Sequence, residues 1–407
     1  MELSSSRQDI ICKWGVVQHT LLRRRAREED SKVTSVELFF DLVFVYAVTQ
    51  LSHSLLGNPT LEGLVHTAVL LLAVWWVWVF TAWVTNWLDP QKSPVRLLLF
   101  ALMFAGLLLS NALPHAFESE GRVFAFAYVF MQLARSLFMC GVLSTERGAN
   151  YRNFLRITAW LAASAVFWIA GGFAKDETRL ALWLIALAIE YVSPAVGFWT
   201  PVLGRSTTAD WDVSGAHMAE RCGLFIIIAL GESLLVTGAT YAHLEHNLPS
   251  DLAFASAFIA TIAMWWIYFN IGAERASEHI AHTHDPGRLA RAAYTYAHLP
   301  IVAGIILAAV GDELVLAHPL GAAAETAFMP ILTSAIVFLI GNLIFKRLVF
   351  GRGAKSHLAG IAALIVFGFA APHTTQLIQS CGTGAILIIV AVWETLVVGR
   401  QRSHDNC

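Results

Sequence analysis

The stretch VELFFDLVFVYAVTQLS at residues 36–52 decides the fold class. It places two carboxylates, Glu37 and Asp41, in a segment that otherwise has the composition of a lipid-exposed helix. At 100° per residue, Glu37, Asp41, Thr49 and Ser52 fall within a sector of about 120°. An ionisable group at bilayer depth costs several kcal/mol unless it is paired or hydrated. The stretch therefore predicts a membrane-spanning helix with one functional polar stripe.

The composition of the whole chain agrees with this reading. Hydrophobic residues make up 57% of the 407 residues and charged residues only 14%, and the mean hydropathy is +0.61. An ordinary soluble domain is roughly a quarter charged. The net charge of −2 argues against nucleic acid as a partner. The five cysteines are far apart and form no C-x-x-C pair, so neither a disulfide framework nor a zinc site is expected.

Twelve segments are long and apolar enough to span a bilayer, which takes about 20 residues each. We therefore expect an all-α polytopic membrane protein whose first helix is its own insertion signal, because residues 1–35 resemble no cleavable signal peptide. The expected spans lie near residues 36–56, 64–88, 94–113, 122–143, 154–173, 179–199, 216–240, 251–272, 290–311, 324–346, 356–373 and 379–398.

An internal duplication is indicated by matches between the two halves. Glu37 in VELFFDLVFV aligns with Glu220 in AERCGLFIII at an offset of 183. Further matches follow in the same order, namely Trp75-Trp76 with Trp265-Trp266, Pro94–Leu97 with Pro286–Leu289, and Glu190 with Glu394. Six helices per half is an even number, so the halves would be parallel repeats, which in transporters commonly enclose a site at their interface. The alternative is that duplication only builds a stable bundle.

These matches give the expected domain organisation. A cytoplasmic segment at 1–35 precedes the first six-helix repeat at 36–199. A cytoplasmic linker at 200–215 leads to the second repeat at 216–398, and a cytoplasmic tail follows at 399–407.

Two buried charges stand out beyond the first helix. Glu232 comes twelve residues after Glu220, about 18 Å further along a helix. It aligns with Thr49, and it is either a functional carboxylate or a structural hydrogen-bond acceptor. Arg135 needs a carboxylate partner, for which we expect Asp41 or Glu37. That pair is either functional or architectural.

The aromatic and histidine residues allow two readings each. The tryptophans at 75–87 suit either an interfacial belt or an aromatic pocket. His298 is either a proton relay or a satisfied core histidine. His279, His282 and His284 lie close together, but their spacing is not that of a closed metal site, and we expect a solvated loop.

The segments at 36–52 and 220–233 (ERCGLFIIIALGES), set beside WWVW and WWIY, resemble the bacterial low temperature requirement A family from about residue 30 to 398. The resemblance implies a multi-pass protein of the bacterial cytoplasmic (inner) membrane, linked by name to growth in the cold. It implies no defined reaction. The family's motif positions are Glu37, Phe40, Asp41, Glu220, Arg221, Gly231 and Glu232.

We expect a secondary transporter or permease that uses intramembrane carboxylates. The alternatives are a cation channel lined by the first and seventh helices, and a membrane-embedded lipid-modifying enzyme with Glu232 and His298 as acid and base. The expected partners are membrane lipid and a small-molecule or ion substrate, including protons, with no catalytic residue, cofactor or metal. The expected pathway residues are Glu37, Asp41, Thr49, Arg135, Glu190, Glu220, Arg221, Glu232, His298 and Glu394.

The distribution of Lys and Arg predicts that both termini are cytoplasmic, because 23 of the 27 then fall on the cytoplasmic side. A fluorescent protein fused to the C-terminus should fluoresce, and alkaline phosphatase fused there should be inactive. Active phosphatase at this position would contradict the twelve-helix topology.

Overall fold

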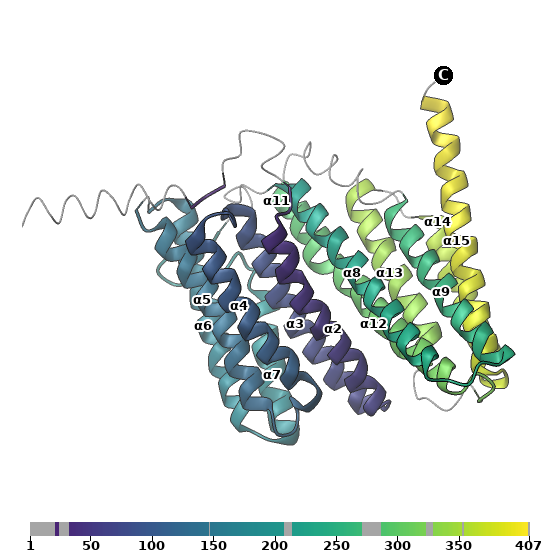
Figure 1. Cartoon of the computed structure of the whole chain (residues 1–407). Helices are drawn as coiled ribbons and strands as arrows, with labels where there is room; N and C mark the ends of the chain where they lie inside the picture. The colour runs from purple at the N-terminus through teal and green to yellow at the C-terminus, as the bar shows by residue number, and fades with distance from the viewer. Residues whose placement is uncertain are drawn as a thin grey trace, which may run out of the picture. The chain divides into compact units, whose positions relative to one another are not determined.

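The computed structural model of the chain is helical throughout the part it describes, which is residues 21–23, 32–145, 147–206, 214–270, 286–322, 329–351 and 354–405. Within these ranges the chain forms twelve long helices and no β-strand beyond isolated bridges (Figure 1). The predicted all-α fold is confirmed. Eleven of the described helices are long and apolar enough to cross a bilayer, as expected for a multi-pass membrane protein.

The chain divides into two compact units. The first unit contains the described residues of 1–47 and 72–218, and the second contains those of 48–71 and 219–407. Both α2 (Ser35–Gly57) and α3 (Leu61–Trp87) pass from one unit into the other. The predicted division into repeats at 36–199 and 216–398 remains a prediction.

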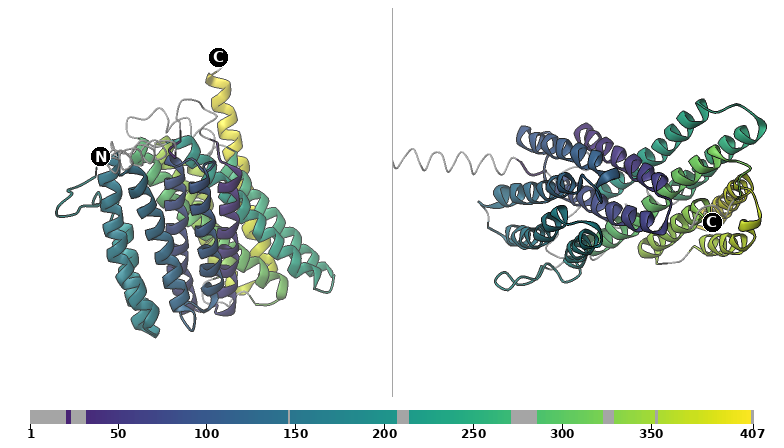
Figure 2. Two further views of the ribbon diagram at one scale, coloured as in Figure 1. Left: turned by 60° about the vertical axis from the view of Figure 1, so that its left-hand side comes forward. Right: turned by 90° about the horizontal axis from the view of Figure 1, so that it is seen from below.

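The first unit is built mainly from helices that pack against their neighbours in sequence. These are α4 (Ser93–Ala112), α5 (Gly121–Leu143), α6 (Ala149–Phe173) and α7 (Asp176–Val192), which run side by side in Figures 1 and 2. The sixth span, predicted at 179–199, ends earlier because Pro194 cannot donate a helical hydrogen bond.

Aromatic side chains fill the interior of this unit. The rings of Tyr128 and Trp168 lie 4.4 Å apart, and those of Trp168 and Trp183 lie 5.5 Å apart. Trp75, Trp76 and Trp78 on α3 are at most 2% exposed, so their indole rings are buried in the protein. Of the two readings of these tryptophans, this burial argues against an interfacial belt for these three residues.

The second unit contains the remaining helices, except that the start of α8, up to Met218, belongs to the first unit. They are α8 (Gly215–Ala242), α9 (Leu248–Phe269), α11 (Pro286–Ala290) continuing through a π-helical turn (Arg291–Ala297) into α12 (His298–Ala317), α13 (Pro330–Phe350), α14 (Lys355–Ala370) and α15 (Gln376–Asp405). The C-terminal part of α15 projects beyond its neighbours in this unit (Figures 1 and 2).

Glycines bring α12 and α13 into direct backbone contact. A methyl group on Gly304 would lie 2.8 Å from the backbone nitrogen of Phe338, and one on Gly341 would lie 2.7 Å from that of Ile301. Small residues allow such close approach between membrane helices. This contact fixes the position of α12, and with it the carboxylate of Asp312 discussed below.

Gly304→Ala and Gly341→Ala should each lower the stability of the purified protein by about 1–3 kcal/mol, because the helices must separate to admit the methyl group. Gly238→Ala is the matched control, since nothing lies within 4 Å of the position that the methyl group would take on α8. Thermal unfolding in detergent measures the difference. Equal melting temperatures for all three variants would contradict the close packing.

Candidate functional site

Glu37 is fully buried and held by two basic side chains of the first unit. Arg23 Nη2 donates to Glu37 Oε2 at 2.7 Å, and His217 Nε2 lies 2.9 Å from Oε1. The backbone and hydroxyl of Thr34 also donate to Oε2, at 2.9 Å each. These partners balance the negative charge of the carboxylate, and their contacts join the segment before α2 to the start of α8.

Asp41 lies one turn further along α2 and is also fully buried. The indole Nε1 of Trp78 on α3 donates to its Oδ1 at 2.7 Å. Asp41 and Thr49 of the predicted polar stripe are both buried, but Trp78 was not predicted as a donor to Asp41. The available signal was the run of tryptophans at bilayer depth on the following helix, each carrying one N–H that needs an acceptor when buried.

The predicted pairing of Arg135 with Asp41 or Glu37 is wrong. Arg135 Nη1 donates to the Val77 carbonyl at 3.0 Å and to Thr81 Oγ1 at 2.8 Å, while Nη2 donates to Gln132 Oε1. The guanidinium also lies 5.6 Å from the centre of the Phe80 ring. Neutral oxygens and an aromatic face therefore satisfy most of its donors without an ion pair among the described residues.

The hydrogen bonds around Arg135 extend through neighbouring side chains to Glu190 on α7. Gln132 Nε2 donates to Tyr128 Oη at 3.0 Å, and Tyr128 in turn donates to Glu190 Oε2. Ser164 and the indole of Trp168 donate to the other carboxylate oxygen at 2.7 and 3.0 Å. Glu190 thus sits in a fully buried network drawn from α5, α6 and α7.

Glu394 forms a buried ion pair in the second unit. Lys346 Nζ lies 2.6 Å from Glu394 Oε1, donates to the Ile267 carbonyl at 2.9 Å, and lies 3.4 Å from His357 Nε2. Lys346 and His357 were not found from sequence. Lys346 was counted among the cytoplasmic basic residues because it stands at the end of an apolar segment next to Arg347.

Glu232 has a different environment from the other carboxylates. Thr49 Oγ1 on α2 donates to its Oε1 at 2.6 Å, and both residues belong to the second unit. The side chain is partly exposed, and no ion pair reaches it within the described residues. Of the neighbouring motif residues, Glu220 is exposed, while Arg221 is fully buried.

His298 is fully buried where the π-helical turn joins α12. The Ala293 carbonyl lies 2.8 Å from Nδ1 and can only accept, so Nδ1 carries the proton. Nε2 then accepts from Tyr268 Oη at 2.8 Å. These contacts are those of a satisfied core histidine, the second of the two readings.

His279, His282 and His284 lie outside the described residues. Within the described ranges, no group of three or more His, Cys, Asp or Glu side chains is placed to hold a metal ion.

Removing one member of the Lys346–Glu394 pair should destabilise the protein by about 3–5 kcal/mol, because it leaves an uncompensated buried charge. We expect Glu394→Gln and Lys346→Met each to lower the melting temperature strongly, and the double variant to recover much of the loss. A double-mutant cycle on the detergent-solubilised protein measures the coupling, and additive losses would show that the two side chains do not interact.

Comparison with known proteins assigns the family. A protein of Rhizobium meliloti (strain 1021), named "Uncharacterized protein RA0937", is 42% identical over 386 residues, which cover 94% of each chain. No solved structure matches the chain. The family model described as "Bacterial low temperature requirement A protein (LtrA)" matches residues 32–392. With almost the whole chain matched, this protein belongs to the bacterial low temperature requirement A family.

Proposed function

We propose that this protein is a secondary transporter of the bacterial cytoplasmic membrane, and that Glu232 takes up and releases the coupling proton. The observation that carries the proposal is the contrast between Glu232 and three other intramembrane carboxylates, Glu37, Glu190 and Glu394. Glu37 and Glu394 have basic partners, and Glu190 has a full set of donors. Glu232 has one hydroxyl donor and is partly exposed.

This environment suits reversible protonation. Protonating Glu37 or Glu394 would leave a buried cation without its partner, which is strongly unfavourable. Protonating Glu232 strands no cation among the described residues. The Thr49 hydroxyl can donate to the carboxylate and accept from the carboxylic acid, so the same contact serves both states. The side chain is also only partly buried, which leaves it open to proton exchange.

The predicted duplication supports a transporter architecture. Thr49 and Glu232 are 183 residues apart, which is the offset that aligns Glu37 with Glu220. Glu190 accepts from side chains on α5 and α6, the two helices before its own. The partner of Glu394 comes from α13, and His357 of α14 lies beside that partner. In each predicted half, the carboxylate on the last helix contacts a side chain from an earlier helix of that half, although neutral donors hold Glu190 and an ion pair holds Glu394.

We favour transport over the lipid-modifying enzyme. That alternative uses His298 as an acid or base together with Glu232, yet both ring nitrogens of His298 are occupied by Tyr268 and the Ala293 carbonyl. The cation-channel alternative is separated from transport by coupling, because a channel passes ions without a coupled cargo.

Glu232→Gln should abolish function while leaving insertion and yield normal, because glutamine keeps the shape and the hydrogen-bonding capacity but cannot carry the proton. The family's name supplies a first assay, which is restoration of low-temperature growth in a bacterium lacking its own family member. Thr49→Ser, which keeps the hydroxyl, should restore growth, and Thr49→Val should restore it poorly. All variants are compared at equal protein levels.

A second assay measures protons directly. Proteoliposomes that contain a pH-sensitive dye are given amino acids, sugars, Na⁺ or K⁺ one at a time, and solute-dependent proton movement is recorded. We expect at least one solute to move protons with the wild-type protein and none with Glu232→Gln. Full activity of Glu232→Gln in both assays would remove Glu232 from the mechanism.

A further inference from the structure

Asp312 on α12 is a buried carboxylate that the proposed mechanism does not use. Its side chain is 8% exposed and lines a small cavity between α9, α12, α13 and α15. No hydrogen bond or ion pair to the carboxylate occurs within the described part of the chain. A buried ionised group without compensation is very costly, and such groups are normally paired or bound to a metal ion.

The other polar groups of the cavity are hydroxyls whose protons are already used. Ser334 Oγ donates to the Ile331 carbonyl at 2.7 Å, and Thr261 Oγ1 donates to the Ala257 carbonyl at 3.0 Å. A hydroxyl has one proton and two lone pairs. These two oxygens therefore present only lone pairs to any further ligand.

The same reasoning applies to Ser380. Its hydroxyl lies 2.6 Å from that of Ser256, and Ser256 already donates to the Ala253 carbonyl at 2.9 Å. Ser380 must therefore be the donor in the Ser256–Ser380 contact, so its oxygen also has only lone pairs left for the cavity.

Thr383 is the fourth hydroxyl residue that lines the cavity, and it gives independent evidence for a ligand site. Its hydroxyl is buried, its side chain is 3% exposed, and within the described residues it has no hydrogen-bond partner. Buried hydroxyls without partners are uncommon, and they often mark the place where a water or an ion binds.

We propose that this cavity binds one dehydrated monovalent cation of the Na⁺ class, with Asp312 as the charged ligand and the hydroxyl oxygens of Thr261, Ser334, Ser380 and Thr383 as neutral ligands. The hydroxyl oxygens of Thr261, Ser334 and Ser380 have only lone pairs to offer, and together with the carboxylate of Asp312 they suit a hard cation and disfavour an anion. One carboxylate balances one positive charge. The cavity has a volume of about 10 Å³, which is room for a single small occupant.

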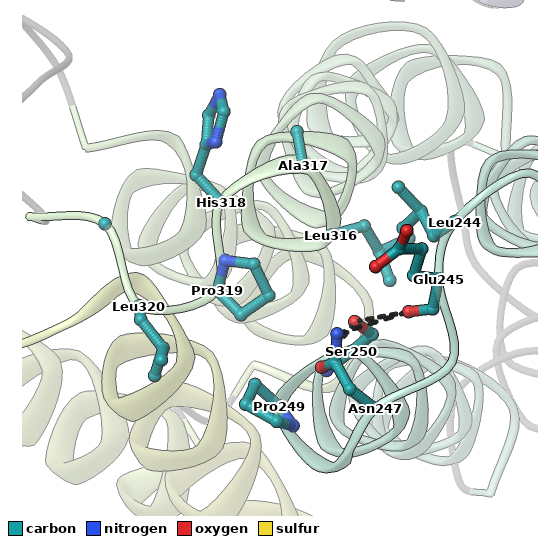
Figure 3. A pocket seen from close by; sticks show the side chains of 11 residues that line it. Leu244, Glu245, Asn247, Pro249, Ser250, Leu316, Ala317, His318, Pro319 and Leu320 are labelled. Atoms are coloured by element: carbon teal, nitrogen blue, oxygen red, sulfur yellow. Dashed lines mark hydrogen bonds between the residues drawn. The ribbon is translucent and has the colours of Figure 1, made fainter.

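An open groove lies at the end of α12 nearest this cavity. It has a volume of about 770 Å³ and is lined by the loop between α8 and α9 and by the last residues of α12 (Figure 3). Leu316, one turn beyond Asp312, lines the groove and packs in a cluster with Ala253 and Ile331. Glu245 adds a carboxylate to the groove, which would attract cations. The groove lies at the end of α12 that is nearer to Asp312.

The cation site is independent of the proton exchange proposed at Glu232, because it rests on different residues and is tested by binding alone. Thermal unfolding of the purified full-length protein is measured while NaCl or KCl replaces choline chloride at constant ionic strength. A ligand that binds only the folded state raises the melting temperature as its concentration rises. We expect such a rise with Na⁺ or K⁺ in the wild-type protein.

Asp312→Asn should remove this dependence, and Thr383→Val should raise the apparent Kd by roughly tenfold. Glu313→Gln is the matched control, since it removes the adjacent carboxylate on the same helix, which does not line the cavity. It should keep the wild-type response. If Asp312→Asn cannot be purified, Thr383→Val against Glu313→Gln decides the question.

Three results would overturn the site: no response of the wild-type protein to either cation, an equal response in Asp312→Asn, or a response to divalent cations alone. A melting temperature that depends on pH but not on Na⁺ or K⁺ would likewise show that Asp312 only binds a proton.

Discussion

The cost of burying charge in a low-dielectric interior is the constraint on which this structure depends. It explains why Glu37 lies between Arg23 and His217, and why Glu394 lies against Lys346. Each contact joins parts of the chain that are distant in sequence, so neutralising the charge also fixes the helices that carry it. These clusters act as structural anchors, and their protonation would be opposed by the partner left behind.

Arg135 shows that neutral groups can meet the same requirement. Its guanidinium is held by oxygens of Val77, Thr81 and Gln132 and by the face of Phe80, with no ion pair among the described residues. Glu232 and Asp312 have neither a basic partner nor the several neutral donors that hold Glu190 within the described chain. Glu232 has one hydroxyl donor and is partly exposed, and Asp312 lines a small cavity together with four hydroxyl side chains. The first suits a proton and the second a bound cation.

Sequence predicted the family, the membrane class and most spans, because composition and hydrophobic length act locally. It also placed the buried stripe of α2 correctly. It could not identify partners, since Trp78 or Lys346 becomes a partner only when separate helices pack together.

Asp312 was missed for a specific reason. The ninth span was expected to end at residue 311, where two carboxylates resemble a helix boundary, but α12 continues to Ala317. The Arg135 pairing failed because depth in the membrane was used as a substitute for contact.

The central claim is that Glu232 changes protonation during function while the paired carboxylates do not. Infrared difference spectroscopy on the reconstituted protein tests it most directly, because a protonated carboxyl group has its own C=O stretching band, which shifts in D₂O. A pH step also protonates the exposed carboxylates, so the relevant signal is the component of this band that Glu232 contributes. That component should be present in the wild-type protein and in Glu313→Gln, and absent in Glu232→Gln. An unchanged band in Glu232→Gln would show that another group carries the proton and would contradict the mechanism.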